Sequence, residues 1–178
     1  IYAGGAHART AMLENGLSAV WEAGDELAVW ARNSAGAFAL QNQIFKTYGL
    51  DERRGFFTSV LSEPMPEDTY TYFCSYPAPI SVNGTAATFG IPSVQNGKAS
   101  GGADVMIASP VQHGALTAMP DPEDHSGMSM IMNRMMHQFR FWVPAEDQVL
   151  GDEKIEKILM TFPTAVTGNV TFDVADLT

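Results

Sequence analysis

The residues best able to bind a metal ion or move a proton are four histidines and 20 carboxylates, in a chain of 178 residues. The densest group joins one upstream histidine to an acidic loop and consists of His113, Asp121, Glu123, Asp124 and His125. A calcium loop needs oxygen ligands at alternate positions, a glycine at its sharp turn and a closing glutamate, whereas this loop has prolines at 120 and 122. We therefore expect a solvated turn and no metal site.

The other candidates for catalysis lack the partners that their chemistry requires. His137 lies in an apolar stretch without the HExxH spacing of a zinc site. Cys74 has no positively charged neighbour in sequence to stabilise a thiolate, and no serine lies in a GxSxG turn. The glycine-rich stretch 97–102 has its lysine directly after the first glycine, unlike a phosphate loop. We expect no catalytic residue and no cofactor, and we do not expect an enzyme.

Aromatic side chains offer a different chemistry, because a sugar ring can stack on an exposed tryptophan or tyrosine. The sequence has enough tryptophans and tyrosines to form such a surface: Trp21, Trp30, Trp142, Tyr70, Tyr72 and Tyr76. Within 70–76, however, strand geometry puts the three tyrosines and Cys74 on one face and Phe73 on the other. This alternation favours a sheet core. A glycan-binding surface stays the alternative, and burial of the tryptophans would remove its main support.

Charge and composition exclude several classes of partner. The chain has 10 Lys plus Arg and 20 Asp plus Glu, so its formal net charge is −10 at pH 7. Nucleic acids and anionic membrane surfaces are bound mainly through clustered Lys and Arg, which this sequence lacks. One cysteine cannot form an internal disulfide or a Cys-based zinc site. The sequence has no run of 18 apolar residues, so we expect no transmembrane segment.

The 16 glycines and 10 prolines divide the chain into runs of about five to ten residues, a spacing typical of an all-β sandwich. We expect a single domain over residues 1–178. Strand-like runs lie at 17–22, 26–32, 37–45, 56–61, 70–76, 85–91, 104–108 and 169–175. We expect the first two runs to form a hairpin around the turn at Gly24 and Asp25.

Two segments carry conflicting signals. Residues 128–143 are rich in methionine, a helix former, but their apolar positions alternate as in a strand with a bulge or register change near Arg134. Residues 152–160 have apolar residues at helical spacing, whereas the residues that follow suit a sheet. Helix and strand both stay open, and we favour a strand in each segment, the second beginning near Lys154.

Several short pieces in colinear order carry a family resemblance. They are Arg9-Thr10, the run VWEAGDELAV at 20–29, residues 56–61 and 70–77, IPSVQ at 91–95, DVMIA at 104–108 and the ending 155–174. Together they resemble the fimbrillin family, the surface pilus and anchor subunits of gut and oral anaerobes. The methionine-rich segment departs from the family pattern, because Arg134 occupies the family's histidine position and Met132 its phenylalanine position.

The resemblance implies a transthyretin-like antiparallel β-sandwich with Greek-key-type connections. In the family this sandwich is the N-terminal domain of a two-domain subunit, so either a C-terminal domain lies outside this chain or the protein is a short member. Family members are exported to the cell surface, often as lipoproteins, and polymerise when a proteolytically freed groove accepts a strand from a neighbour. The start at Ile1, without Met or signal peptide, agrees with a processed chain.

We therefore expect a structural subunit of a cell-surface fimbria or adhesin, outer-membrane-associated or fimbrial. Its expected partners are other fimbrial subunits or copies of itself, with a host or bacterial surface ligand as a further partner and no nucleic acid. Arg9 is a candidate processing point for an Arg-specific protease, although an ordinary exposed arginine is the simpler interpretation. The alternatives are a surface glycan-binding β-sandwich and, less favoured, a jelly-roll hydrolase with two carboxylates in one cleft. An open groove beside an edge strand would favour assembly.

Overall fold

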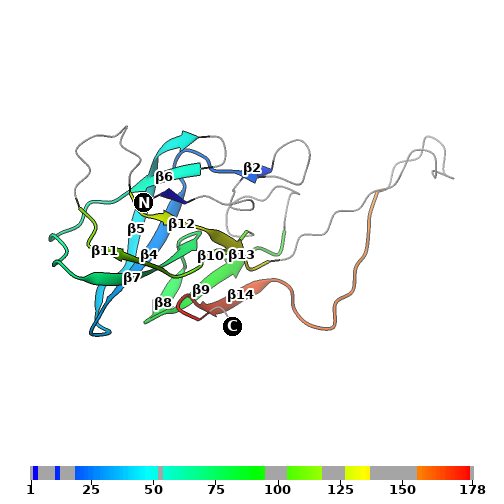
Figure 1. Cartoon of the computed structure of the whole chain (residues 1–178). Helices are drawn as coiled ribbons and strands as arrows, with labels where there is room; N and C mark the ends of the chain where they lie inside the picture. The colour runs from blue at the N-terminus through cyan, green and yellow to red at the C-terminus, as the bar shows by residue number, and fades with distance from the viewer. Residues whose placement is uncertain are drawn as a thin grey trace.

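The computed structural model describes residues 2–3, 11–12, 19–51, 54–94, 104–117, 127–136 and 156–176. In these ranges every regular element is a β-strand (Figure 1). The predicted all-β class is therefore confirmed. Across the described ranges we find no helix with the length and apolar character needed to span a membrane.

The strands form three sheets. A nine-stranded sheet, called here the large sheet, has the order β12-β1-β6-β5-β4-β7-β10-β13, with β11 also paired to β7. A small sheet has the order β14-β9-β8, and β2 pairs with β3. The bounds are β1 Tyr2–Ala3, β2 Ala11–Met12, β3 Ala19–Val20, β4 Glu26–Asn33, β5 Phe38–Asp51, β6 Arg54–Thr58, β7 Thr69–Tyr76, β8 Ser81–Asn83, β9 Ala86–Ile91, β10 Met106–Ala108, β11 Val111–Gly114, β12 Ser129–Met130, β13 Met132–Arg134 and β14 Gly168–Asp173.

β4 and β7 are paired neighbours in the large sheet and are buried on both faces. Alternate residues of each strand therefore enter two different hydrophobic cores. The inner core contains Trp21, Leu27, Val29, Ala31, Leu40, Phe45, Phe57, Tyr70, Tyr72, Cys74, Tyr76, Met106, Ala108, Met128, Met130 and Met132. The outer core contains Ala28, Trp30, Phe73, Ala87, Phe89, Ile91, Val105, Ile107 and Val174. The predicted division of residues 70–76, tyrosines on one face and Phe73 on the other, is confirmed.

The large sheet closes on itself through one short segment of chain. β12 pairs with β1 at one end of the strand order and β13 pairs with β10 at the other, yet only Ile131 separates β12 from β13. Met130 and Met132 on either side of it are buried in the inner core. The methionine-rich segment thus joins the two ends of the large sheet and contributes side chains to the inner core.

The small sheet covers the other face of the large sheet. Alternate residues of β9, namely Ala87, Phe89 and Ile91, lie in the outer core with Trp30 of β4. Val170 and Phe172 of β14 pack against the same core. The two sheets therefore pack face to face, as expected of a sandwich, and the transthyretin-like topology stays a prediction.

A bulge in β5 keeps its apolar residues on the inner face. Leu40 and Phe45 have opposite parity, so in an uninterrupted strand they would point to opposite faces. The pairing with β4 shifts between Val29 and Ala31, opposite this stretch, and Asn42 adopts a positive φ of 55°. The extra residue restores both side chains to the inner core.

Several sequence expectations need correction. β3 pairs with β2 and not with β4, so the hairpin expected around Gly24 is wrong. In the methionine-rich segment the favoured strand is confirmed over β12 and β13, and Met128, Met130 and Met132 lie together in the inner core. Residues 137–143, which follow the register change predicted near Arg134, lie outside the described residues, so that change stays a prediction. Residues 156–160 form no strand, because their side chains are exposed and nothing in the described sheets pairs with them. The β1–β12 pair is parallel in an otherwise antiparallel structure.

Gly55 in β6 is required by close packing beneath Trp21. A Cβ at this position would lie 2.7 Å from Cε2 of Phe57 and 2.9 Å from Cγ of Trp21. The Trp21 ring itself packs edge-on against Phe57 and Tyr76, with centroids 5.0 and 5.2 Å apart. The rings have no room to move without disturbing the inner core.

We predict that Gly55→Ala lowers the free energy of unfolding by about 1–3 kcal/mol, because overpacking forces side chains from their rotamers. Urea unfolding followed by tryptophan fluorescence measures the change. Gly114→Ala is the matched control, since a Cβ there meets nothing within 4 Å. Equal stability of the two variants would contradict this packing.

Candidate functional site

The outer side of β5 is an open backbone edge of the large sheet over part of its length. β5 pairs with β4 from Phe38 to Lys46, but its pairing with β6 covers only Lys46 to Asp51. In the part of the chain that the structure describes, no strand therefore lies along the outer side of residues 38–45. The backbone N–H and C=O groups of this stretch that point away from β4 form an open template for a further strand.

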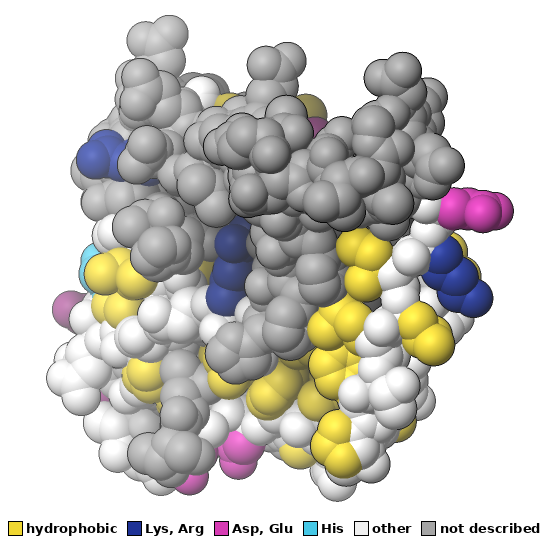
Figure 2. All heavy atoms as spheres, turned by 90° about the vertical axis from the view of Figure 1, so that its right-hand side faces the viewer, with side chains coloured by type: hydrophobic (Ala, Val, Ile, Leu, Met, Phe, Trp, Pro, Cys, Tyr) yellow, Lys and Arg dark blue, Asp and Glu magenta, His cyan; other side chains and the backbone are white. Residues whose placement is uncertain are grey.

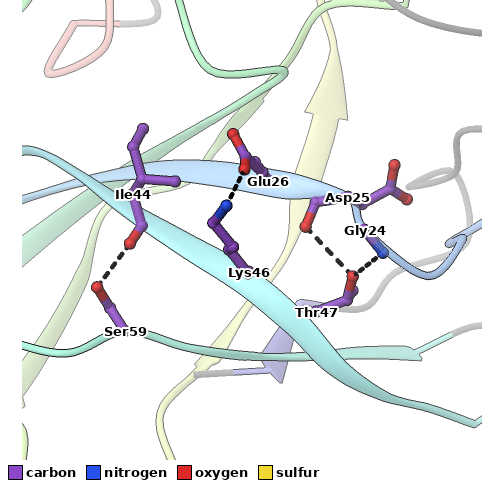
Figure 3. Close-up of polar contacts among 7 residues, drawn as sticks. All are labelled: Gly24, Asp25, Glu26, Ile44, Lys46, Thr47 and Ser59. Carbon is purple, nitrogen blue, oxygen red and sulfur yellow. Dashed lines mark hydrogen bonds and ion pairs between the residues drawn. The ribbon is translucent and has the colours of Figure 1, made fainter.

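Ser59 marks where this open edge begins (Figure 3). Its hydroxyl donates to the Ile44 carbonyl at 2.6 Å and accepts from the Gln43 side-chain amide at 2.8 Å. The chain after β6 thus caps one outward carbonyl with a side chain and then leaves the sheet.

The end of the β4–β5 pairing, directly after the open edge, is held firmly. The Thr47 hydroxyl accepts from the Gly24 N–H at 2.9 Å and the Thr47 N–H donates to the Asp25 carbonyl at 3.0 Å. Lys46 and Glu26 form an ion pair at 2.8 Å across the two strands (Figure 3). Because that pair is largely exposed, it adds little stability, and the backbone contacts at Thr47 do most of the anchoring. The open edge at residues 38–45 therefore belongs to a strand that β4 holds in place.

A groove of about 460 Å³ runs beside the open edge, between β5 and residues 61–68. Its apolar lining includes Leu40, Leu61, Met65 and Tyr70, and Leu61 and Met65 also pack against the inner core. Its polar lining includes Glu63, Glu67 and Asp68, and none of the described residues that line it is Lys, Arg or His. The groove combines apolar contact with a negative rim.

Hydrogen bonds fix the wall of the groove opposite β5. The Tyr70 hydroxyl donates to the Pro66 carbonyl at 2.9 Å, and the Ser34 hydroxyl donates to Asp68 at 3.2 Å. Prolines 64 and 66 cannot donate to a sheet ladder, so this wall cannot pair with β5 as a regular strand would. The groove therefore stays open beside the edge. Chemically it can accept an extended peptide and one or more apolar side chains.

The candidate catalytic and metal residues do not converge. Cys74 is fully buried, and burial raises the pKa of its thiol, so it is a core residue and not a nucleophile. His113 is exposed on β11 with its ring 6.4 Å from that of Tyr72. The described residues contain no group of three or more His, Cys, Asp or Glu that could hold a metal ion. Arg9, the glycine-rich stretch 97–102, the acidic residues Asp121 to His125 and His137 lie outside the described residues.

The candidate sugar-binding aromatics are core residues. Trp21, Trp30, Tyr70, Tyr72 and Tyr76 are each at most 5% exposed, and Trp142 lies outside the described residues. The Trp30 indole donates to the Gly84 carbonyl at 3.1 Å, and the Tyr72 hydroxyl donates to the Gly114 carbonyl at 2.8 Å. Burial raises the Tyr72 pKa to about 12. None of the five offers an open ring face to a sugar.

One buried ion pair closes the end of the large sheet. Nε and Nη2 of Arg134 on β13 donate to Oδ2 of Asp104 at 3.1 and 2.9 Å, and the Asp104 side chain is only 2% exposed. Its other oxygen, Oδ1, has no hydrogen-bond partner among the described residues. Burial raises the pKa of Asp104, and the guanidinium partly offsets that rise. Arg134 thus compensates a buried carboxylate.

Comparison with known proteins adds little. No family model matches the chain, and no curated protein matches it. Among solved structures it resembles a candidate cell adhesion protein from Bacteroides uniformis, with 20% sequence identity and a TM-score of 0.46. The match covers 65% of this chain and 43% of that one, so the chain spans less than half of that protein. A likeness this weak establishes neither fold nor function, and membership of the fimbrillin family stays a prediction.

We predict that Arg134→Met lowers the free energy of unfolding by about 3–5 kcal/mol at neutral pH, because it leaves Asp104 buried without its partner. The pKa of Asp104 then rises further above the unfolded value of 3.8, so the folded state binds a proton more tightly. The loss of stability should therefore shrink as the pH falls towards the ordinary aspartate range.

Urea unfolding at a series of pH values measures this dependence. The double variant Asp104→Asn with Arg134→Met is the control, since it removes both charges and its loss should not shrink as the pH falls. A loss in the single variant that is the same at every pH would contradict the assigned pairing.

Proposed function

We propose that this protein is a structural subunit of a cell-surface fimbria or adhesin and that it joins other subunits by strand addition at the open edge of β5. The observation that carries the proposal is the coincidence of an unpaired sheet edge at residues 38–45 with a groove that leads to Leu40, Leu61 and Met65. The role needs no catalytic residue, metal or cofactor. It places the protein at the cell surface, outer-membrane-associated or in a fimbria.

Strand addition uses both parts of this site. An incoming strand pairs its backbone with the outward N–H and C=O groups of β5, while alternate side chains of that strand enter the groove. Natural proteins usually cover or charge such an edge, because an open edge recruits other chains. Here the neighbouring segment 61–68 stands off from β5 and leaves space between them.

The charge of the groove restricts the incoming strand. Glu63, Glu67 and Asp68 lie along the rim, in a chain of net charge −10. An acidic strand would be repelled there, whereas an apolar strand with neutral or basic flanks would not. We infer that the donor segment carries few carboxylates and alternates apolar with polar residues.

A glycan-binding surface is the other function considered for this chain. It would need exposed aromatic rings, and the five described candidates are buried. No observation on the described residues favours it over assembly.

We predict that Ala39→Lys prevents incorporation into surface fibres of the cells that produce the protein. Ala39 is exposed and lines the groove on the open edge, so an added strand would bury the new ammonium group. Removing that charge from water costs more than the roughly 1.4 kcal/mol that corresponds to a tenfold change, so incorporation should fall by about tenfold or more. Immunoblots of sheared fibre fractions measure it.

Ala35→Lys is the matched control. Ala35 is also exposed, but it lies in the turn between β4 and β5 and does not line the groove. It makes the same change in net charge, so it should incorporate normally. Equal incorporation of both variants, with both folded by circular dichroism, would contradict assembly at this edge.

A further inference from the structure

Residues 156–167, called here the arm, expose apolar side chains to an unusual degree. Ile158, Leu159, Met160 and Val166 are 49%, 80%, 38% and 50% exposed. The arm has no regular secondary structure and extends away from the strands before the chain enters β14, as its orange trace shows in Figure 1. Figure 2 views the molecule from this side, and hydrophobic side chains form a band there. A contiguous apolar surface of this kind marks a contact with another molecule.

The arm has the residue pattern of a strand. Ile158 and Met160 share their parity with Val170, Phe172 and Val174, the residues through which β14 and its end contact the outer core. Of the residues with the opposite parity, Lys157, Thr161 and Thr167 are polar, whereas Leu159 is apolar and 80% exposed. Over residues 158–162, alternate residues of the arm therefore form an apolar face like that of β14. It lacks a sheet to join among the described strands.

The outer edge of β14 is open. The Val174 N–H donates to the Thr85 carbonyl at 3.0 Å, on the side of β9. Because successive residues of a strand alternate the direction of their N–H and C=O groups, Asn169 and Thr171 direct theirs to the opposite side. In the described part of the chain β9 is the strand that pairs with β14, so that opposite side has no strand beside it.

Charge favours a second copy of this chain as the occupant of that edge. Residues 158–172 contain no Asp, Glu, Lys or Arg, although the whole chain carries a net charge of −10. Two acidic molecules can therefore approach here with less repulsion than elsewhere. The same stretch holds both a strand-patterned arm and an open edge. Such self-complementarity is what a two-fold interface between identical chains requires.

We propose that two copies of the protein exchange arms, each adding its arm antiparallel to the outer edge of the partner's β14. A two-fold axis beside Val166 places Ile158 beside Val174 and Met160 beside Phe172 of the other copy. Every pair then joins residues of like parity, so the apolar side of each arm extends the apolar face of the small sheet. Pro163 lacks an N–H, so the added strand ends before it.

This exchange uses the small sheet, whereas the proposed assembly uses β5 in the large sheet. The two can therefore succeed or fail separately. The competing arrangement is a hairpin in which the arm folds back onto β14 of its own chain. That arrangement would give the same backbone pairing within a monomer, and the experiment must separate the two.

Disulfide trapping separates them, using a full chain with Thr161→Cys and Thr171→Cys. In the exchanged dimer these residues face each other on the polar side, about 5.5 Å apart between Cα atoms, which a disulfide can span. Cys74 is buried and does not compete. Mild oxidation should give a covalent dimer on a non-reducing gel, with a peptide joining positions 161 and 171 by mass spectrometry. A monomer with an internal disulfide would overturn the proposal.

Thr88→Cys combined with Thr161→Cys is the matched control. Thr88 is paired with Thr171 across the small sheet, so it lies one strand farther from the added arm, about 9–10 Å away and beyond disulfide reach. Dimer formation no greater in the test variant than in this control would also overturn the proposal.

Sedimentation of the protein without added cysteines gives an independent measurement. Met160→Ser should shift the dimer to monomer, because it removes an apolar contact of the arm. Val60→Ser, at a residue 92% exposed elsewhere on the surface, should leave the dimer unchanged. A monomeric parent protein, or equal behaviour of the two variants, contradicts the exchange.

Discussion

The structure depends on β4 and β7, two neighbouring strands whose side chains are buried on both faces of the large sheet. Both faces must be covered by something, since residues such as Trp30 and Tyr72 carry too much apolar surface to be left in water. The curled large sheet encloses one face, and the small sheet covers the other. The two open edges described above, those of β5 and β14, lie where one of these two covers ends.

The sequence was sufficient to predict the strands with long apolar alternation. β7, β9 and β14 were found from residues that alternate with a period of two, whereas β4, buried on both faces, was found as a continuous apolar run after a turn signal. β8 and β11 were missed because they have three and four residues and are largely exposed, so their sequences show no such pattern. The closure of the large sheet at Ile131 joins distant segments, which local patterns do not reveal.

The candidate site could be predicted only in part. Two prolines at 64 and 66 correctly indicated a turn after β6. The open edge itself arises because β5 has 14 residues and β6 only five, a mismatch that follows from pairing and not from either sequence alone. The bulge at Asn42, which aims Leu40 at the inner core beside the groove, depends on the same pairing. The described tryptophans and tyrosines considered as a sugar-binding surface are buried core residues.

The central claim is that β5 receives a strand from another subunit, and hydrogen–deuterium exchange of the assembled and unassembled protein tests it most directly. Backbone amides exchange slowly once they join a sheet ladder. We expect outward amides within residues 38–45 to exchange quickly in the isolated protein and slowly in surface fibres, while those of β4 stay slow in both. Fibres in which the amides of residues 38–45 exchange as fast as in the isolated protein would contradict the account.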